Sequence, residues 1–149
     1  MTKDVLIRVK GLQSVGEEDG ADAPIEIVTV GEYYFRNGSH YLRYEELEDG
    51  GPGTTVNYIK FGETGLEVRK KGVTNVHMVF QEQKKNVTYY QTPYGSLQMG
   101  IAATKMNLKE SENDLNVTVD YVLEMNDEYV ADCYITIDVQ PKGSPGFVL

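Results

Sequence analysis

The side chains in this sequence that are capable of chemistry are scattered and do not form a motif. Cys133 is the single cysteine, and His40 and His77 are the two histidines, so the chain offers few ligands for zinc. The glycine-rich stretch 50–53 lacks the Gly-Lys-Ser/Thr ending of a phosphate-binding loop, and no Gly-x-Ser-x-Gly nucleophile turn occurs. We therefore predict no catalytic residue, no metal site, no cofactor and no enzymatic activity.

A local run of acidic residues occupies positions 17–22, which read Glu-Glu-Asp-Gly-Ala-Asp. Its carboxylate oxygens are of the kind that binds calcium, but their spacing differs from that of an EF-hand loop. We interpret the run as a solvated acidic loop.

Glu45 and Glu46 form a carboxylate pair inside a strand-like stretch. Adjacent strand residues point to opposite faces of a sheet, so these two carboxylates cannot act together on one substrate bond. If Leu42 faces the core, His40, Tyr44 and Glu46 face it too. Polar groups would then lie inside the fold, where they must be hydrogen-bonded or hydrated.

Eleven tyrosines are the remaining candidates for a binding site. An inward tyrosine offers an apolar ring and a hydroxyl to a ligand, although tyrosine also packs well in any strand. Alternation groups Tyr33 with Ile27, Tyr58 with Val56, and Tyr121 with the inward set of the last hairpin. The predicted ligand-binding residues of a lumen are Tyr33, His40, Tyr44, Glu46, Tyr58 and Tyr121.

These residues lie on a chain whose apolar pattern repeats every two positions. Between 115 and 125 the apolar residues occupy the odd positions, and the pattern resumes between 129 and 139. Such alternation is typical of strands with one buried face, and here it predicts a long hairpin. Similar stretches predict strands at about 4–12, 25–35, 39–46, 54–61, 65–71, 75–82, 86–92, 95–108, 115–126 and 129–139.

Most gaps between these strands are short, which makes sequence neighbours antiparallel. Asn37-Gly38 is the strongest turn signal, because both residues accept the positive φ angles of a type I′ hairpin. Gly31 and Gly100 lie inside strands and fit sharp bends. We predict an all-β fold, an antiparallel up-and-down meander barrel of about 8–10 strands. Residues 1–140 would form this single domain and 141–149 a loosely packed tail.

Charge limits the expected partners of this chain. The net charge is −9 and the pI is about 4.7, which argues against nucleic acid and anionic membranes as partners. The sequence shows no signal-peptide pattern and no apolar stretch long enough to span a membrane, so we expect a cytoplasmic protein. The oligomeric state is left open.

Several motifs resemble those of the bacterial YwiB-like family. The matching residues are Gly31-Glu32-Tyr33-Tyr34, Tyr41 to Glu46, Arg69, Gly72, Met78, Phe80, and Tyr90 to Leu97 with its Thr-Pro-Tyr-Gly turn. The resemblance covers nearly the whole chain and implies a calycin-like, or lipocalin-like, β-barrel. That family is uncharacterised, so the resemblance assigns no catalytic residue.

Two functions remain after these exclusions. The first is binding of a small apolar or amphipathic ligand in the barrel lumen. The alternative is a protein–protein interaction module whose barrel is filled by side chains and whose acidic surface suits a basic partner. The volume of the lumen distinguishes the two, because a ligand requires a cavity of a few hundred Å³.

Overall fold

The computed structural model describes residues 3–11, 26–47, 53–72, 75–92 and 94–142, and these form ten strands. The strands are β1 (Asp4–Lys10), β2 (Glu26–Arg36), β3 (Ser39–Leu47), β4 (Thr54–Phe61), β5 (Gly65–Gly72), β6 (Val76–Gln81), β7 (Lys85–Thr92), β8 (Gly95–Ser111), β9 (Asp114–Met125) and β10 (Glu128–Pro141). The predicted all-β class is confirmed. The acidic run 17–22 and the tail from 143 onward lie outside the described residues. Within the described part, no helix is long and apolar enough to cross a membrane.

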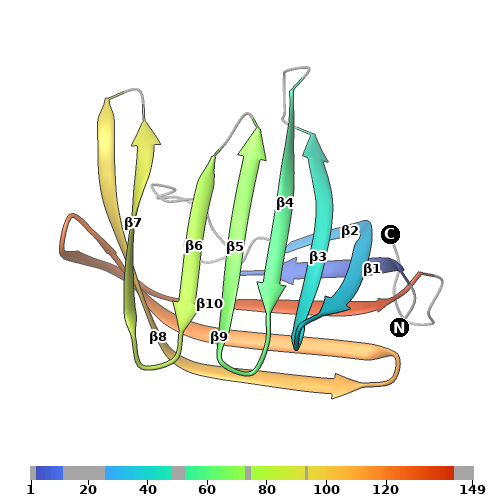
Figure 1. Cartoon of the computed structure of the whole chain (residues 1–149). Helices are drawn as coiled ribbons and strands as arrows, with labels where there is room; N and C mark the ends of the chain where they lie inside the picture. The colour runs from blue at the N-terminus through green and yellow to red at the C-terminus, as the bar shows by residue number, and fades with distance from the viewer. Residues whose placement is uncertain (1–2, 12–25, 48–52, 73–74, 93, 143–149) are drawn as a thin grey trace.

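The strands form one antiparallel sheet in the order β6-β5-β4-β3-β2-β1-β10-β9-β8-β7. β1 pairs on one side with β2 and on the other with β10, so the two ends of the chain meet inside the sheet. Figure 1 shows β3 to β6 standing upright while β8, β9 and β10 run across them. The sheet curves into a nearly closed barrel, which confirms the meander prediction.

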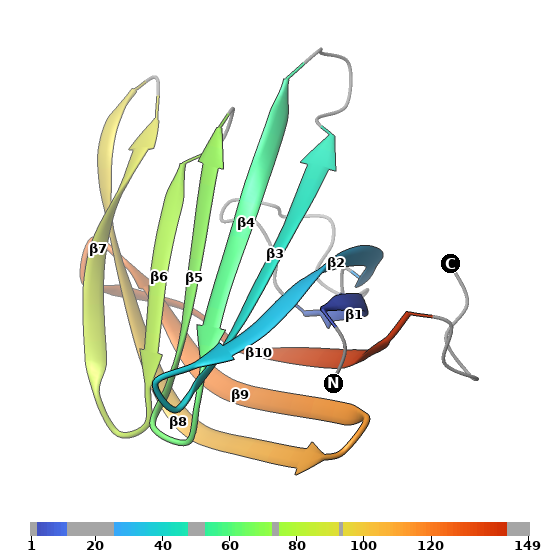
Figure 2. The same ribbon diagram turned by 45° about the vertical axis from the view of Figure 1, so that its right-hand side comes forward.

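Closure of the barrel is incomplete between β6 and β7, which are consecutive in sequence but form the two ends of the sheet. Their connection is tied to β8 instead: the Gln83 amide donates to the Ala103 carbonyl at 2.9 Å, and the Met106 amide donates to Glu82 Oε2 at 2.9 Å. The register of β8 shifts between Ala103 and Lys105, which marks a β-bulge. Figure 2 shows the upright start of β8 turning into its transverse half.

The centre of the barrel is filled by apolar side chains that form one continuous cluster. In β9 the buried residues are the odd ones predicted from the sequence, from Leu115 to Tyr121. In β10 the same parity holds from Ala131 onward, and Cys133 is half-buried against the core. Tyr129 is also an odd residue, but it is 64% exposed, because the register of β10 shifts between Tyr129 and Ala131.

Backbone conformation confirms two predicted turns. Asn37 and Gly38 both have positive φ angles, 52° and 80°, as a type I′ hairpin requires. Gly95 begins β8 with a φ of 122°, a conformation that side chains with a Cβ rarely adopt. Gly31 serves a different purpose: a Cβ there would lie 2.5 Å from Ile7 Cδ1 and 2.7 Å from the Arg43 carbonyl oxygen. Strands β1, β2 and β3 therefore approach each other this closely only because Gly31 has no side chain.

The parity of the β9–β10 hairpin can be tested with one pair of variants. Val119 is 0% exposed and Thr118 lies on the opposite face of β9. We expect Val119→Asp to lower the free energy of unfolding by roughly 3 kcal/mol or more, because it buries an unpaired charge. Thr118→Asp should change it by less than about 1 kcal/mol. Urea unfolding measures both, and equal losses of stability would contradict the register.

Candidate functional site

A pocket of about 820 Å³ opens at one end of the barrel. We call it the mouth pocket; it lies between the β2–β3 hairpin, the β4–β5 turn, the end of β6 and the β8–β9 hairpin. Its lining residues are Tyr33, Phe35, Gly38, Ser39, His40, Lys60 to Glu67, Val79, Phe80, Gln81, Glu110, Ser111, Glu112 and Leu115. The volume is typical of sites for small molecules.

A hydrogen-bonded polar chain crosses the wall of this pocket. The Tyr33 hydroxyl lies 2.9 Å from His40 Nδ1, and His40 Nε2 lies 2.6 Å from Glu110 Oε1. A carboxylate only accepts hydrogen bonds, so Nε2 carries a proton and donates it to Glu110. In the neutral imidazole Nδ1 is then an acceptor, and the Tyr33 hydroxyl donates to it.

The imidazole of His40 is held in a fixed orientation by aromatic rings. Its ring stacks on Phe61 at a centroid distance of 4.9 Å and packs against Phe35 at 5.0 Å. His40 is 5% exposed, whereas the Glu110 side chain is 51% exposed. Burial, and then the negative charge of Glu110, raise the pKa of Tyr33. The pocket therefore presents an uncharged phenol and a hydrogen-bonded imidazole in its wall, with a carboxylate at its rim.

Local sequence places the first two members of the polar chain but not the third. Tyr33 and His40 flank the Asn37-Gly38 turn on paired strands, so a short hairpin brings them together. Glu110 comes from β8, seventy positions after His40. We did not predict it, because β8 was expected to end at about 108. A usable signal was present in the sequence: the large apolar residues Leu97, Met99 and Ile101 are odd, whereas Met106 and Leu108 are even. This change of parity marks the bulge and makes position 110 the next inward one.

The predicted lumen residues are separated along the barrel axis. His40, Tyr44 and Glu46 do share a face, but His40 pairs with Phe61 and Glu46 with Thr55, at opposite ends of β3. Six residues of strand separate them by roughly 20 Å. Tyr44 is 2% exposed in the core, and burial raises its pKa. Only Tyr33 and His40 of the predicted set line the mouth pocket.

Glu46 belongs to a second polar group at the other end of the barrel. Its Oε1 accepts hydrogen bonds from Asn57 Nδ2 at 2.7 Å and from Lys70 Nζ at 3.1 Å. Tyr121, by contrast, is 5% exposed and packs edge-on against Phe80 at a centroid distance of 4.9 Å. Tyr121 is therefore a core residue beneath the mouth pocket and does not line it.

The prediction that Tyr58 faces the lumen is wrong. Tyr58 is 40% exposed on the outer face of β4, and Lys71 Nζ lies 6.0 Å from the centre of its ring. The inward positions of β4 are taken by its odd residues, including the fully buried Asn57. The apolar side chains of Val56 and Tyr58 suggested that the even residues of β4 face inward. Asn57 is buried instead, because its amide donates a hydrogen bond to Glu46.

The described residues contain no group of three or more His, Cys, Asp or Glu side chains arranged to hold a metal ion. Burial raises the pKa of the Cys133 thiol, which disfavours the nucleophilic thiolate. The chemistry that the structure assembles is therefore that of the mouth pocket.

Comparison with known proteins relates this chain to one family. The model of "Domain of unknown function (DUF1934)" matches residues 7–137. The chain is 26% identical over 117 residues to the "Uncharacterized beta-barrel protein YwiB" of Bacillus subtilis, covering 78% of this chain and 81% of that protein. The fold is similar to the crystal structure of the ywiB protein from Bacillus subtilis, with a TM-score of 0.71, 20% identity, and coverage of 93% of this chain and 92% of the other.

The polar chain makes a prediction about the ionisation of Tyr33. Glu110→Gln removes the charge that disfavours the phenolate, so the pKa of Tyr33 should fall. It should stay above the ordinary value for tyrosine, because burial is the larger cause of the shift and remains. NMR titration of protein carrying ¹³C-labelled tyrosine measures this pKa, with Tyr33→Phe identifying the signal. An unchanged pKa in Glu110→Gln would show that the carboxylate does not act on the phenol.

Proposed function

This chain belongs to the DUF1934 family, whose description assigns no function, and we propose from the geometry that it binds a small amphipathic molecule in the mouth pocket. The observation that carries the proposal is the pocket of about 820 Å³ with an apolar floor and a polar wall. A concave site in which apolar side chains meet a few converging polar groups is the usual form of a small-molecule site, and this pocket combines the two with a large polar share.

The apolar side chains of the mouth pocket suit the apolar part of such a ligand. Phe61 and Leu66 are each 1% exposed and Phe80 is 0% exposed, so these three close the floor, while the accessible apolar surface belongs to Phe35, which is 58% exposed, and to the partly buried Tyr33. A ligand that covers Phe35 and Tyr33 removes apolar surface from water at about 25 cal/mol per Å², before the costs of association are subtracted. This gain favours an alkyl chain or a ring system.

The wall and rim of the pocket suit the polar part of the ligand. Ser39 and Ser111 line the pocket beside the Tyr33–His40–Glu110 chain. Glu110 is half exposed, which leaves part of its carboxylate available beyond its bond to His40. A ligand with one polar end could therefore hydrogen-bond at the rim while its apolar end lies on the floor.

The ligand is proposed to bind at the mouth and not deep in the lumen. Leu42, Tyr44 and Ile59 are at most 2% exposed and belong to the cluster that fills the centre of the barrel. A molecule reaching past Phe61 would have to displace these side chains. Tyr44 and Tyr121 therefore serve as core residues, and ligand-binding variants belong at the mouth.

The proposal predicts binding of N-phenyl-1-naphthylamine, an uncharged dye whose fluorescence rises in apolar surroundings. Phe35 lines the pocket and is 58% exposed, so its truncation should cost little stability. We expect Phe35→Ala to weaken dye binding by about tenfold, because it removes one aromatic wall. Val30→Ala is the control, since Val30 is an exposed apolar residue of the same strand outside the pocket lining. Absence of dye binding to the wild-type protein, or equal losses in both variants, would contradict the proposal.

A second candidate function is the binding of an extended protein segment, and the unpaired edges of β6 and β7 favour it. Extended peptides add to such edges through main-chain hydrogen bonds. On β7, Val87 is 47% exposed and Tyr89 is 68% exposed, which provides side-chain contacts beside the edge. The acidic net charge of −9 would suit a basic partner.

Selection of random peptides displayed on phage tests this second candidate. Peptides enriched on the wild-type protein should be basic and rich in strand-forming residues, and they should bind Tyr89→Lys at least about tenfold more weakly. Tyr129→Lys is the matched control, because Tyr129 is 64% exposed but lies on β10. Peptides that bind Tyr89→Lys as tightly as wild type would exclude the β7 edge as their site.

A further inference from the structure

We propose that the mouth pocket selects ligands whose polar end carries a positive charge, such as alkylamines and other cationic amphiphiles. This inference rests on the proposed function, because it names the class of molecule that the same pocket would take. Four features of the pocket support it: the carboxylates at its rim, the direction of the nearby cations, the aromatic walls and the hydrogen-bonding state of His40.

Carboxylates dominate the charge at the rim of the pocket. Glu63 in the β4–β5 turn, Glu110 at the end of β8 and Glu112 in the β8–β9 turn all line it. They come from two separate hairpins, β4–β5 and β8–β9, so they lie around the opening and are not a single acidic run. Like charges held together at one opening make a local negative potential that attracts a cation and repels an anion.

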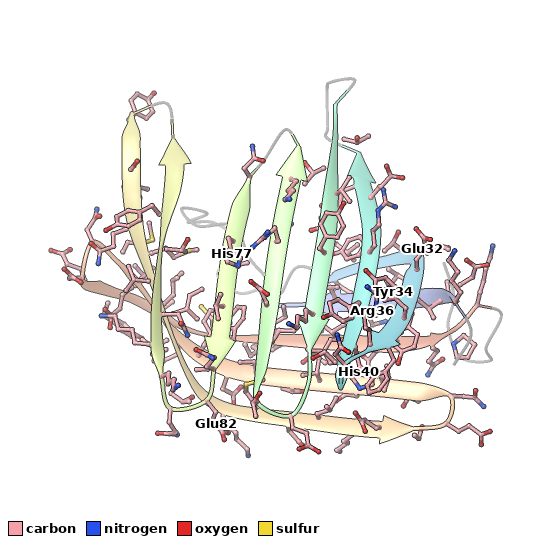
Figure 3. The ribbon with its side chains drawn as sticks, viewed as in Figure 1. Glu32, Tyr34, Arg36, His40, His77 and Glu82 are labelled. Atoms are coloured by element: carbon pink, nitrogen blue, oxygen red, sulfur yellow. The ribbon has the colours of Figure 1, made fainter. Side chains whose placement is uncertain are left out.

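Two cationic side chains near this end of the barrel, Lys60 and Arg36, are directed toward its outer face. Lys60 contributes to the lining, but its Nζ lies 5.7 Å from the centre of the Tyr41 ring, a residue of the outer face. The guanidinium of Arg36 lies 5.9 Å from the centre of the Tyr34 ring, also outside. Figure 3 shows Tyr34 and Arg36 beside each other on β2, with His40 at the lower end of β3. Cation–π contacts of this kind hold both charges on the outer surface.

Aromatic rings form much of the pocket wall, where Tyr33, Phe35 and His40 meet Phe61. The face of an aromatic ring carries a negative partial charge, which stabilises an ammonium group that has lost part of its hydration. The combination of aromatic walls with carboxylates at the opening therefore favours a cationic group that is attached to an apolar body.

An anionic polar end finds no free donor on the one histidine of the pocket. His40 Nε2 donates to Glu110, and Nδ1 is already hydrogen-bonded to the Tyr33 hydroxyl. A carboxylate or phosphate placed at this wall would meet the lone pairs of Glu110 without a compensating hydrogen bond from the imidazole. A fatty acid is therefore disfavoured relative to an amine with the same chain.

The test compares three probes with the same eight-carbon chain: octylammonium, octanol and octanoate. Each is titrated against the wild-type protein by displacement of N-phenyl-1-naphthylamine and, independently, by NMR chemical-shift changes. We expect octylammonium to bind about tenfold more tightly than octanoate at low ionic strength, with octanol between them. The preference should shrink as salt is added.

Two variants separate the carboxylates at the mouth from the overall acidity of the protein. Glu110→Gln keeps a hydrogen-bond acceptor for His40 but removes the charge, and should weaken octylammonium binding by about fivefold and octanol binding by clearly less. Glu45→Gln makes the same charge change on the exposed face of β3, away from the pocket, and should have no effect. Glu63→Gln gives a second variant at the rim, in case Glu110→Gln disturbs the polar chain.

The possible outcomes distinguish this inference from the proposed function. If no probe binds, octanol and dye included, the proposed function itself is wrong. If octanol binds and octanoate binds as tightly as octylammonium, the pocket is a ligand site without cation selectivity and the inference is overturned. If Glu110→Gln and Glu45→Gln weaken octylammonium binding equally, the preference for a cation comes from the net charge of the protein, and the inference is also overturned.

Discussion

The two-sided pairing of β1 is the constraint on which the rest of the structure depends. Strands β2 to β6 form one meander and β7 to β10 another, and within the described residues no ladder joins β6 to β7. β1 lies between β2 and β10 and connects the two meanders into one sheet. Its inward residues Val5, Ile7 and Val9 are at most 2% exposed, so this connection is also part of the core.

The mouth pocket is lined by residues of both meanders, so it depends on β1 joining them. Tyr33 and His40 belong to the first meander and Glu110 to the second, and the His40–Glu110 hydrogen bond crosses between the two meanders. The bulge in β8 contributes as well, because it changes the parity of the strand and brings Glu110 inward. The polar chain is therefore a product of strand order and one local irregularity, and it has no motif of its own in the sequence.

The interior combines a packed centre with polar groups at both ends. At one end lies the Tyr33–His40–Glu110 chain, and at the other Glu46 is bound by Asn57 and Lys70. Both arrangements supply hydrogen bonds to polar side chains that alternation directs inward, where an unpaired polar group would be costly, although the buried Asn57 Oδ1 has no hydrogen-bond partner among the described residues. A volume of about 820 Å³ opens beside His40, which is why we propose the binding function there.

Local alternation in the sequence determined the strands, their faces and the turns, because the period of two and residues such as Asn37-Gly38 act over a few neighbouring positions. It placed His40 and Tyr44 on the inward face correctly. Short gaps also predicted the pairing of sequence neighbours, but only the tertiary structure decided that β1 pairs with β10, where the barrel stays open and that Glu110 meets His40, since these contacts join distant parts of the chain. The wrong prediction for Tyr58 has the same cause. Its neighbour Asn57 is buried because Glu46 and Lys70 of the neighbouring strands form a polar group with it, and these contacts cannot be read from the local sequence.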